Sequence, residues 1–226
     1  MQLLSKQLLL QQINKHMKKI FLFMMVGSVA LLSSCNNKPA TEETTTETTT
    51  ENTAAEASYK LNADSTSFAV WKGVMLGVKE HNGKVYFKEG SLTTKGTQLV
   101  GGTFTVDLNT ITALDANYDE KAGYGKSKLI GHLQAPDFFD VANFPTASFV
   151  VNSVEGNTAK GTLTVRGKSN EETLTDIVIT ETETGLKAAG KLIFDRQKYD
   201  VKYPGPAKDM VISNDIELNI ELTATK

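Results

Sequence analysis

Two histidines are the side chains with the clearest capacity for site chemistry in the body of this sequence, His81 and His132. A zinc site with histidine and carboxylate ligands needs several donors at close spacing, and neither histidine has such neighbours. We therefore predict no metal. His81 lies in a His-Asn-Gly segment and is expected to be exposed in a turn. His132 is expected to cap or orient the junction between a helix and a loop. No G-x-S-x-G or H-E-x-x-H motif occurs, and we predict neither an enzyme nor a cofactor.

The only cysteine, Cys35, could do a different chemistry, because it follows an apolar run that begins behind basic residues. Residues 20–32 carry no charge, and about 13 residues are too few to span a bilayer, which needs ~20. Ser33 and Ser34 are small, as cleavage of a secretory signal requires. The pattern is typical of bacterial lipoproteins, in which the thiol is acylated with palmitate-type chains and the chain is cut before it. An ordinary secreted protein is the alternative.

Three regions follow from this assignment. Residues 1–34 are predicted to be a signal peptide, with Met17 as an alternative true start. Residues 35–57, rich in Thr and Glu, contain too little apolar surface to fold and are predicted to form a disordered spacer. Residues 58–226 are predicted to form one domain, exported and held by Cys35 at the cell envelope. Asn36 favours the outer membrane, on its periplasmic or surface face.

Charge excludes one class of partner. The chain has 24 basic and 26 acidic residues and a formal net charge of −2. A nucleic-acid-binding domain would be expected to carry a clustered basic face, so no nucleic-acid partner is predicted.

The predicted domain is built from strands, because apolar and polar residues alternate with a period of two. The clearest run has Ile216, Leu218, Ile220 and Leu222 on one face. Similar patterns occur at 67–74, 84–92, 103–108, 147–154, 162–166, 173–182 and 186–195. Turn signals separate the runs at 81–83, 95–97, 155–157, 166–168 and 184–185. About eight strands joined mostly by tight hairpins predict an antiparallel up-and-down barrel, with an open sandwich as the alternative.

One connection differs from the hairpins. Between residues 111 and 146, Leu129, Ile130 and Leu133 form an apolar stripe that predicts a short helix. The following segment contains Phe138 and Phe139 and is too apolar for an exposed loop. We expect the helix and this aromatic loop to cover one end of the barrel as a lid or plug.

Several of these segments resemble the signature of the YceI-like family. Residues 132–140 and 144–149 are similar to its "hL…dFFd…yPtatF" motif, residues 160–168 to its "GtLTlrGv" hairpin, and residues 190–200 to its "inRsdfgi" strand end. The resemblance covers essentially all of residues 58–226. Departures occur at 169–174, which lacks the family's proline, and at Asp200, where glycine is usual. They fall at turns and strand ends and therefore concern local geometry.

The resemblance implies a lipocalin-like barrel of eight antiparallel strands whose lumen binds a polyisoprenoid, an isoprenoid quinone, or a fatty acid or amide. Inward-facing residues are then candidates for the wall of that lumen, although plain core packing is the favoured alternative for any single one of them: Phe87, Phe104, Val106, Phe149, Leu163, Phe194, Leu218 and Ile220. Candidates for the mouth are Leu129, Leu133, Phe138 and Phe139. Trp71 could stack on a ligand but is more typical of a core residue.

Arg196 and Tyr199 are the candidates for contact with a polar head group. For Arg196, a buried pair with a carboxylate at the barrel rim is the favoured alternative, and Tyr203 could supply a second polar handle.

Together these features predict a membrane-tethered carrier for a long apolar or amphiphilic ligand, with the membrane as its second partner. A self-filled barrel that binds an envelope protein or glycan is the alternative, and a hydrolase or isomerase of the bound lipid is a weaker one. A homodimer stays open.

Overall fold

The computed structural model describes residues 54–77, 79–116, 118–119, 121, 123, 125–205 and 211–226. The predicted signal peptide, Met17, Cys35 and most of the predicted spacer lie outside these residues.

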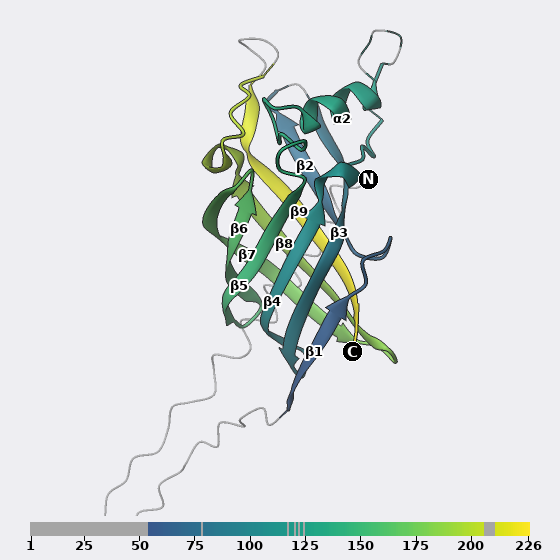
Figure 1. The fold of residues 1–226 in the computed structure, drawn as a ribbon, viewed down its shortest axis with the longest axis vertical. Coiled ribbons are helices and arrows are strands. Elements are labelled where there is room, and N and C mark those ends of the chain that lie inside the picture. Colours follow the sequence, from purple (N-terminus) through teal and green to yellow (C-terminus); the bar gives the residue numbers. More distant parts are fainter. Residues whose placement is uncertain are drawn as a thin grey trace, which may run out of the picture. The chain divides into compact units, whose positions relative to one another are not determined.

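Nine strands form one antiparallel sheet that closes on itself (Figure 1). The neighbours run β1-β3-β2-β9-β8-β7-β6-β5-β4, and pairing of β3 with β4 completes the ring. The strand bounds are β1 Glu56–Leu61, β2 Phe68–Met75, β3 Lys79–Lys95, β4 Gln98–Asp107, β5 Thr146–Glu155, β6 Thr158–Val165, β7 Lys168–Glu181, β8 Gly185–Asp195 and β9 Ile212–Thr225.

The barrel has eight positions around its circumference, because two strands share one of them. The long strand β3 pairs with β2 through its first half and with β1 through its last residues. Both β1 and β2 also pair with β9 on their other side. The predicted eight-stranded, up-and-down, lipocalin-like barrel is therefore confirmed.

Strand β1 is the element that the sequence analysis missed. The predicted spacer ran to residue 57, whereas the strand already begins at Glu56. Tyr59 and Leu61 are both buried, and the strand is short enough that two inward residues carry its whole apolar pattern.

Four of the five predicted turns are present, and one was wrong. Gly96, Gly156 and Gly167 adopt positive φ angles at their hairpins, and the gap between β7 and β8 matches the signal at 184–185. Residues 81–83, in contrast, lie inside β3. The β2–β3 turn is at Gly77, where φ is +70°. Gly83 is needed in the strand because a Cβ there would lie 1.7 Å from the Thr112 carbonyl oxygen and 2.7 Å from the Trp71 ring.

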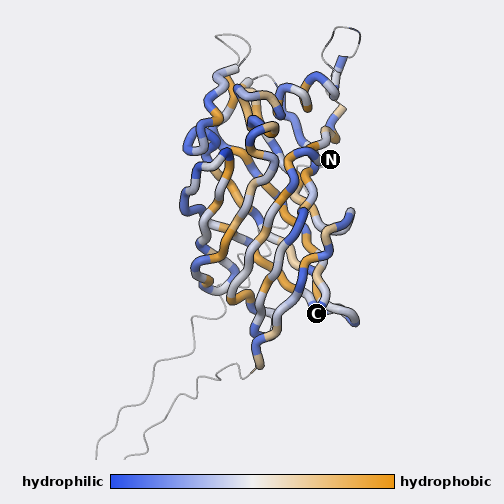
Figure 2. The backbone as a smooth tube through the Cα atoms, in the orientation of Figure 1, coloured by the Kyte–Doolittle hydropathy of each residue, from blue (hydrophilic) through white to orange (hydrophobic). Residues whose placement is uncertain are grey.

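Along the strands, hydrophobic and hydrophilic residues alternate (Figure 2). The inward residues form one core cluster that extends through the barrel. At the end where β1 begins, small and aliphatic side chains are almost fully buried: Leu61, Ala159, Leu186 and Ala224.

The opposite end carries the longer connections (Figure 1). The predicted helix is present as α2, Lys126–Gln134, between β4 and β5. Two single-turn 3-10 helices, η1 (Leu108–Thr110) and η2 (Arg196–Tyr199), follow β4 and β8. Within the part of the chain that the structure describes, no helix is both long and apolar enough to cross a membrane.

Candidate functional site: an apolar cavity in the barrel

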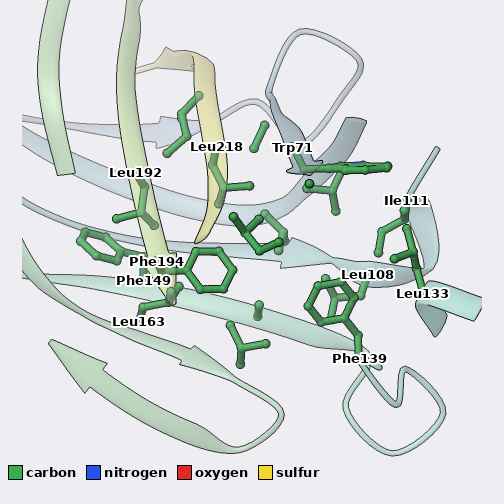
Figure 3. Close-up of a pocket in the computed structure, with 18 of the residues that line it drawn as sticks. Trp71, Leu108, Ile111, Leu133, Phe139, Phe149, Leu163, Leu192, Phe194 and Leu218 are labelled. Atoms are coloured by element: carbon green, nitrogen blue, oxygen red, sulfur yellow. The ribbon is translucent and has the colours of Figure 1, made fainter. Parts of the chain in front are cut away.

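The barrel encloses a cavity of about 740 Å³ that reaches the end covered by α2 (Figure 3). This volume lies within the range of roughly 300–1,000 Å³ typical of small-molecule sites. Strands β2 to β9 and α2 all contribute lining residues, and most of these are aliphatic or aromatic.

All eight residues that the sequence suggested for the lumen wall line this cavity: Phe87, Phe104, Val106, Phe149, Leu163, Phe194, Leu218 and Ile220. They come from six strands, and their inward direction follows from the period-two alternation. The rings of Phe87 and Phe104 meet edge to face, with their centroids 6.3 Å apart. Contact of these residues with a ligand stays a prediction.

A glycine on a neighbouring strand positions Phe149. Its ring lies over Gly161, where a Cβ would come within 2.3 Å of the ring. Phe149 pairs with Leu163 across the β5–β6 ladder, and Gly161 is two residues from Leu163 on the same face. The missing side chain leaves room for the ring to lie along the wall, which keeps the cavity open.

The four predicted mouth residues, Leu129, Leu133, Phe138 and Phe139, also line the cavity. The loop that carries the two phenylalanines folds back on α2, since Phe139 N donates to Leu133 O over 3.0 Å. Arg166 fixes the loop to the barrel.

The Arg166 guanidinium donates from one nitrogen, Nη1, to two backbone oxygens. These are Phe138 O, at 2.7 Å, and Asp200 O, at 2.8 Å. Arg166 directly follows β6 and adopts a φ of +49° in the β6–β7 hairpin. Its two hydrogen bonds therefore connect this hairpin to the loop at Phe138 and to the segment at Asp200. No pattern in the sequence predicts this role of Arg166.

The two head-group candidates do not line the cavity. Arg196 is buried and donates to three backbone carbonyls, those of Val201, Ile212 and Ser213. Burial lowers the pKa of Arg196, and the neighbouring Asp195 opposes this effect. The expected buried carboxylate pair is replaced by these carbonyl contacts, which tie the β8–β9 connection to the barrel.

Tyr199 is completely buried and donates its hydroxyl to Glu172 Oε1 over 3.0 Å. Burial, and then the hydrogen bond and charge of Glu172, raise the pKa of Tyr199 well above its ordinary value. Lys198 Nζ contacts the same carboxylate oxygen at 3.2 Å. Tyr199 is thus part of a structural cluster behind the cavity wall.

His81 is half-buried in β3 and lines the cavity, so its expected exposure in a turn was wrong. Its Nδ1 lies 3.2 Å from Asp115 Oδ1, and its ring stacks on Tyr118 with centroids 5.2 Å apart. Tyr118 donates to Asp115 Oδ2 over 2.7 Å, and burial together with Asp115 raises the Tyr118 pKa. Alternation with Val85 and Phe87 places His81 on the inward face, which was the available sequence signal.

Two further ring nitrogens belong to cavity-lining residues. Trp71 Nε1 and His132 Nε2 are both buried, and neither has a hydrogen-bond partner among the described residues. The His132 ring packs against Tyr203 and Phe138, with centroids 4.5 and 5.5 Å away. Tyr203 lines the cavity as well, and its role as a polar handle stays a prediction.

Chemically, this arrangement can enclose a long apolar group and offer a few polar atoms at one end. No group of three or more His, Cys, Asp or Glu side chains in the described ranges is placed to hold a metal ion.

Several known proteins are similar to this chain. Among solved structures, BcnA of Burkholderia cenocepacia is 18% identical, with a TM-score of 0.54 over 71% of this chain and 98% of that one. A polyisoprenoid binding domain from Saccharophagus degradans is 13% identical, with a TM-score of 0.48 over 74% of this chain and 97% of that one. A YCEI protein of Campylobacter jejuni is 22% identical, with a TM-score of 0.43 over 62% and 83%.

At these identities the BcnA match concerns the fold alone. A search of curated proteins found no match. The model of the YceI-like domain matches residues 59–224, which is most of the chain and all but the ends of the barrel. The chain therefore belongs to the YceI-like family.

Proposed function

We propose that this protein is a carrier that holds one long-chain apolar or amphiphilic molecule, such as a polyisoprenoid, an isoprenoid quinone or a fatty acid or amide, inside its barrel. The observation that carries the proposal is the cavity of about 740 Å³, lined by apolar side chains from nearly every strand. Binding is driven by removal of the ligand's apolar surface from water, at ~25 cal/mol per Å². Part of this gain offsets the cost of ordering the ligand.

The self-filled barrel is less well supported, because an interior packed to the usual protein density would leave few voids larger than a water molecule. Gly161 argues in the same direction, since it lets the Phe149 ring lie against the wall rather than across the lumen. We propose no catalytic step. His81, the polar side chain that a general acid or base would most resemble, is already paired with Asp115.

A direct test is to identify what the protein carries. The full chain with Cys35→Ser would be exported without a lipid anchor, purified without detergent, extracted with organic solvent and analysed by mass spectrometry. A stoichiometric polyprenyl or acyl species supports the carrier. A blank extract, repeated after incubation with envelope lipids, would favour the self-filled alternative.

A matched pair of variants on β5 sharpens this test. Ala147 lines the cavity, whereas Val150 is exposed on the outer face. Ala147→Phe should remove the bound species while the circular dichroism spectrum is retained. Val150→Phe should keep the species. Equal retention in both variants would mean that the ligand lies outside the cavity.

We also propose that Cys35 anchors the carrier to the outer membrane. The support is the apolar run and small residues before Cys35, with Asn36 after it. Metabolic labelling with radioactive palmitate and membrane fractionation test this. Label and outer-membrane recovery should both be lost in Cys35→Ser, and an unlabelled wild-type chain would contradict the proposal.

A further inference from the structure

The cavity has a polar site at the end beneath α2. Trp71 and His132 reach this end from two elements, β2 and α2. Trp71 packs over Gly83 next to the Thr112 backbone, and Figure 3 shows Trp71, Ile111 and Leu133 gathered at the same side of the pocket. His132 directly precedes Leu133 in α2.

Each of these two side chains has one buried nitrogen for which the described structure supplies no partner. Buried polar groups are nearly always hydrogen-bonded in native proteins, and an unpaired one carries a desolvation penalty. Both belong to residues that line the same cavity. The partner that completes them is therefore expected inside the cavity.

The two nitrogens differ in what they require. The indole Nε1 of Trp71 can only donate. The Nδ1 of His132 lies 3.9 Å from Asp137 Oδ2, an electrostatic contact longer than a hydrogen bond. The Nε2 of His132 accepts a hydrogen bond when the ring proton is on Nδ1, which is the tautomer that the proposal below uses. The site beneath α2 thus presents one donor and one acceptor.

Resting on the proposed carrier function, we propose that the ligand is a long-chain alcohol whose hydroxyl lies beneath α2. The hydroxyl oxygen accepts from Trp71 Nε1, and the hydroxyl proton is donated to His132 Nε2. A hydrocarbon satisfies neither nitrogen, and a carbonyl oxygen, which only accepts, satisfies Trp71 alone. The tail extends from this site into the apolar part of the cavity, past Phe149 and Leu163.

The cavity wall also includes Lys79 and Lys128, so a phosphate head is the competing chemistry that the experiment has to separate. The full chain with Cys35→Ser, delipidated, would be titrated with four C20 probes of equal chain length. These are geranylgeraniol, the aldehyde geranylgeranial, geranylgeranyl phosphate and the hydrocarbon in which hydrogen replaces the hydroxyl. Displacement of a fluorescent fatty acid gives each Kd.

The wild-type protein should bind the alcohol at least about fivefold more tightly than the hydrocarbon, since each net hydrogen bond contributes roughly a factor of two to ten. The aldehyde should fall between them, and the phosphate should not exceed the alcohol. Tryptophan emission gives a second measurement, because Trp71 is the only tryptophan in the sequence. The alcohol and the hydrocarbon should shift it differently.

Two variants assign the contacts. His132→Phe keeps a ring against Tyr203 and Phe138 but lacks Nε2, and it should bring the alcohol down to the level of the aldehyde. Trp71→Phe should reduce the affinities for alcohol and aldehyde together. Val150→Phe, which changes an exposed side chain on the outer face of β5, is the matched control and should preserve the wild-type ratios.

Equal binding of alcohol and hydrocarbon by the wild type would overturn the inference while leaving the carrier function in place. Tighter binding of the phosphate, or an alcohol preference that survives both His132→Phe and Trp71→Phe, would also overturn it. Failure of all four probes and of the fluorescent fatty acid to bind would remove the carrier function itself.

Discussion

Arg166 should control how fast a ligand leaves the barrel. Its Nη1 donates to Phe138 O and Asp200 O and so joins the aromatic mouth loop to the end of η2. Arg166→Gln removes both charge-assisted hydrogen bonds. Such bonds contribute roughly 1.5–3 kcal/mol each, so two independent ones would give about 3–6 kcal/mol. Because a single nitrogen of a half-buried side chain makes both, we take a smaller total of about 2–4 kcal/mol. At ~1.4 kcal/mol per factor of ten, the open loop becomes at least about 30-fold more populated.

The assay is stopped-flow dissociation of a fluorescent fatty acid into excess unlabelled competitor. Arg166→Gln should raise koff by at least about 30-fold if the ligand leaves past Phe138 and Phe139. Lys168→Gln is the matched control on the same hairpin. Lys168 contacts Asp200 at 3.4 Å with both side chains exposed, an interaction worth only ~0–1 kcal/mol. An unchanged koff in Arg166→Gln, with a lowered urea midpoint, would refute this exit route.

Three further predictions concern the frame of the barrel. Arg196→Met leaves three carbonyls without their buried donor and should lower the free energy of unfolding by about 3–5 kcal/mol in urea titration; a loss below ~1 kcal/mol would contradict the role of Arg196. Gly83→Ala should lower the free energy of unfolding by at least about 2 kcal/mol and shift the Trp71 emission to longer wavelength. Unchanged emission would mean that the added methyl group displaces the backbone of β3 and not the Trp71 ring. Hydrogen bonds from Asn219 and Lys191, with the charges of Lys72 and Lys191, hold the Glu217 pKa below its usual 4.5, so the stability it contributes is present above that value and is lost as pH falls through the lowered pKa. Glu217→Gln should reduce the fall of the thermal unfolding midpoint as the pH is lowered through the acid range. An equally steep fall in the variant would mean that other carboxylates cause it.

Much of the fold could be predicted because alternation is a local signal. The alternation from Ile216 to Leu222 is enough to predict a strand there. The eight residues predicted for the lumen wall were identified from their positions in such runs. The glycine signal at 81–83 failed because glycine serves two purposes. Gly77 supplies a positive φ in a turn, while Gly83 supplies space for Trp71 across the sheet. Only the three-dimensional neighbour distinguishes these uses.

The polar part of the site was less accessible to sequence reasoning. Arg196 was expected to face a carboxylate or a head group, but its partners are backbone carbonyls. Every residue type has a backbone carbonyl, so the sequence contains no signal for these contacts. His81 contacts Asp115, which lies in an irregular loop, and the hydrophobic pattern of the sequence does not predict the path of that loop. The pairing state of Trp71 Nε1 and His132 Nε2 depends on atoms from several elements and becomes visible only in the assembled barrel.

The position of β1 also bears on the lipid anchor proposed at Cys35. Strand β1 begins at the end of the barrel opposite α2, so a chain anchored through Cys35 is held by the end away from its mouth. The 17 residues of β3, tilted by roughly 40°, give a height of about 40 Å. About 20 residues separate Cys35 from β1, and a chain of that length extends to at most ~70 Å. With the anchor proposed at Cys35, the segment that comes from the membrane would therefore join the barrel about 40 Å from its mouth.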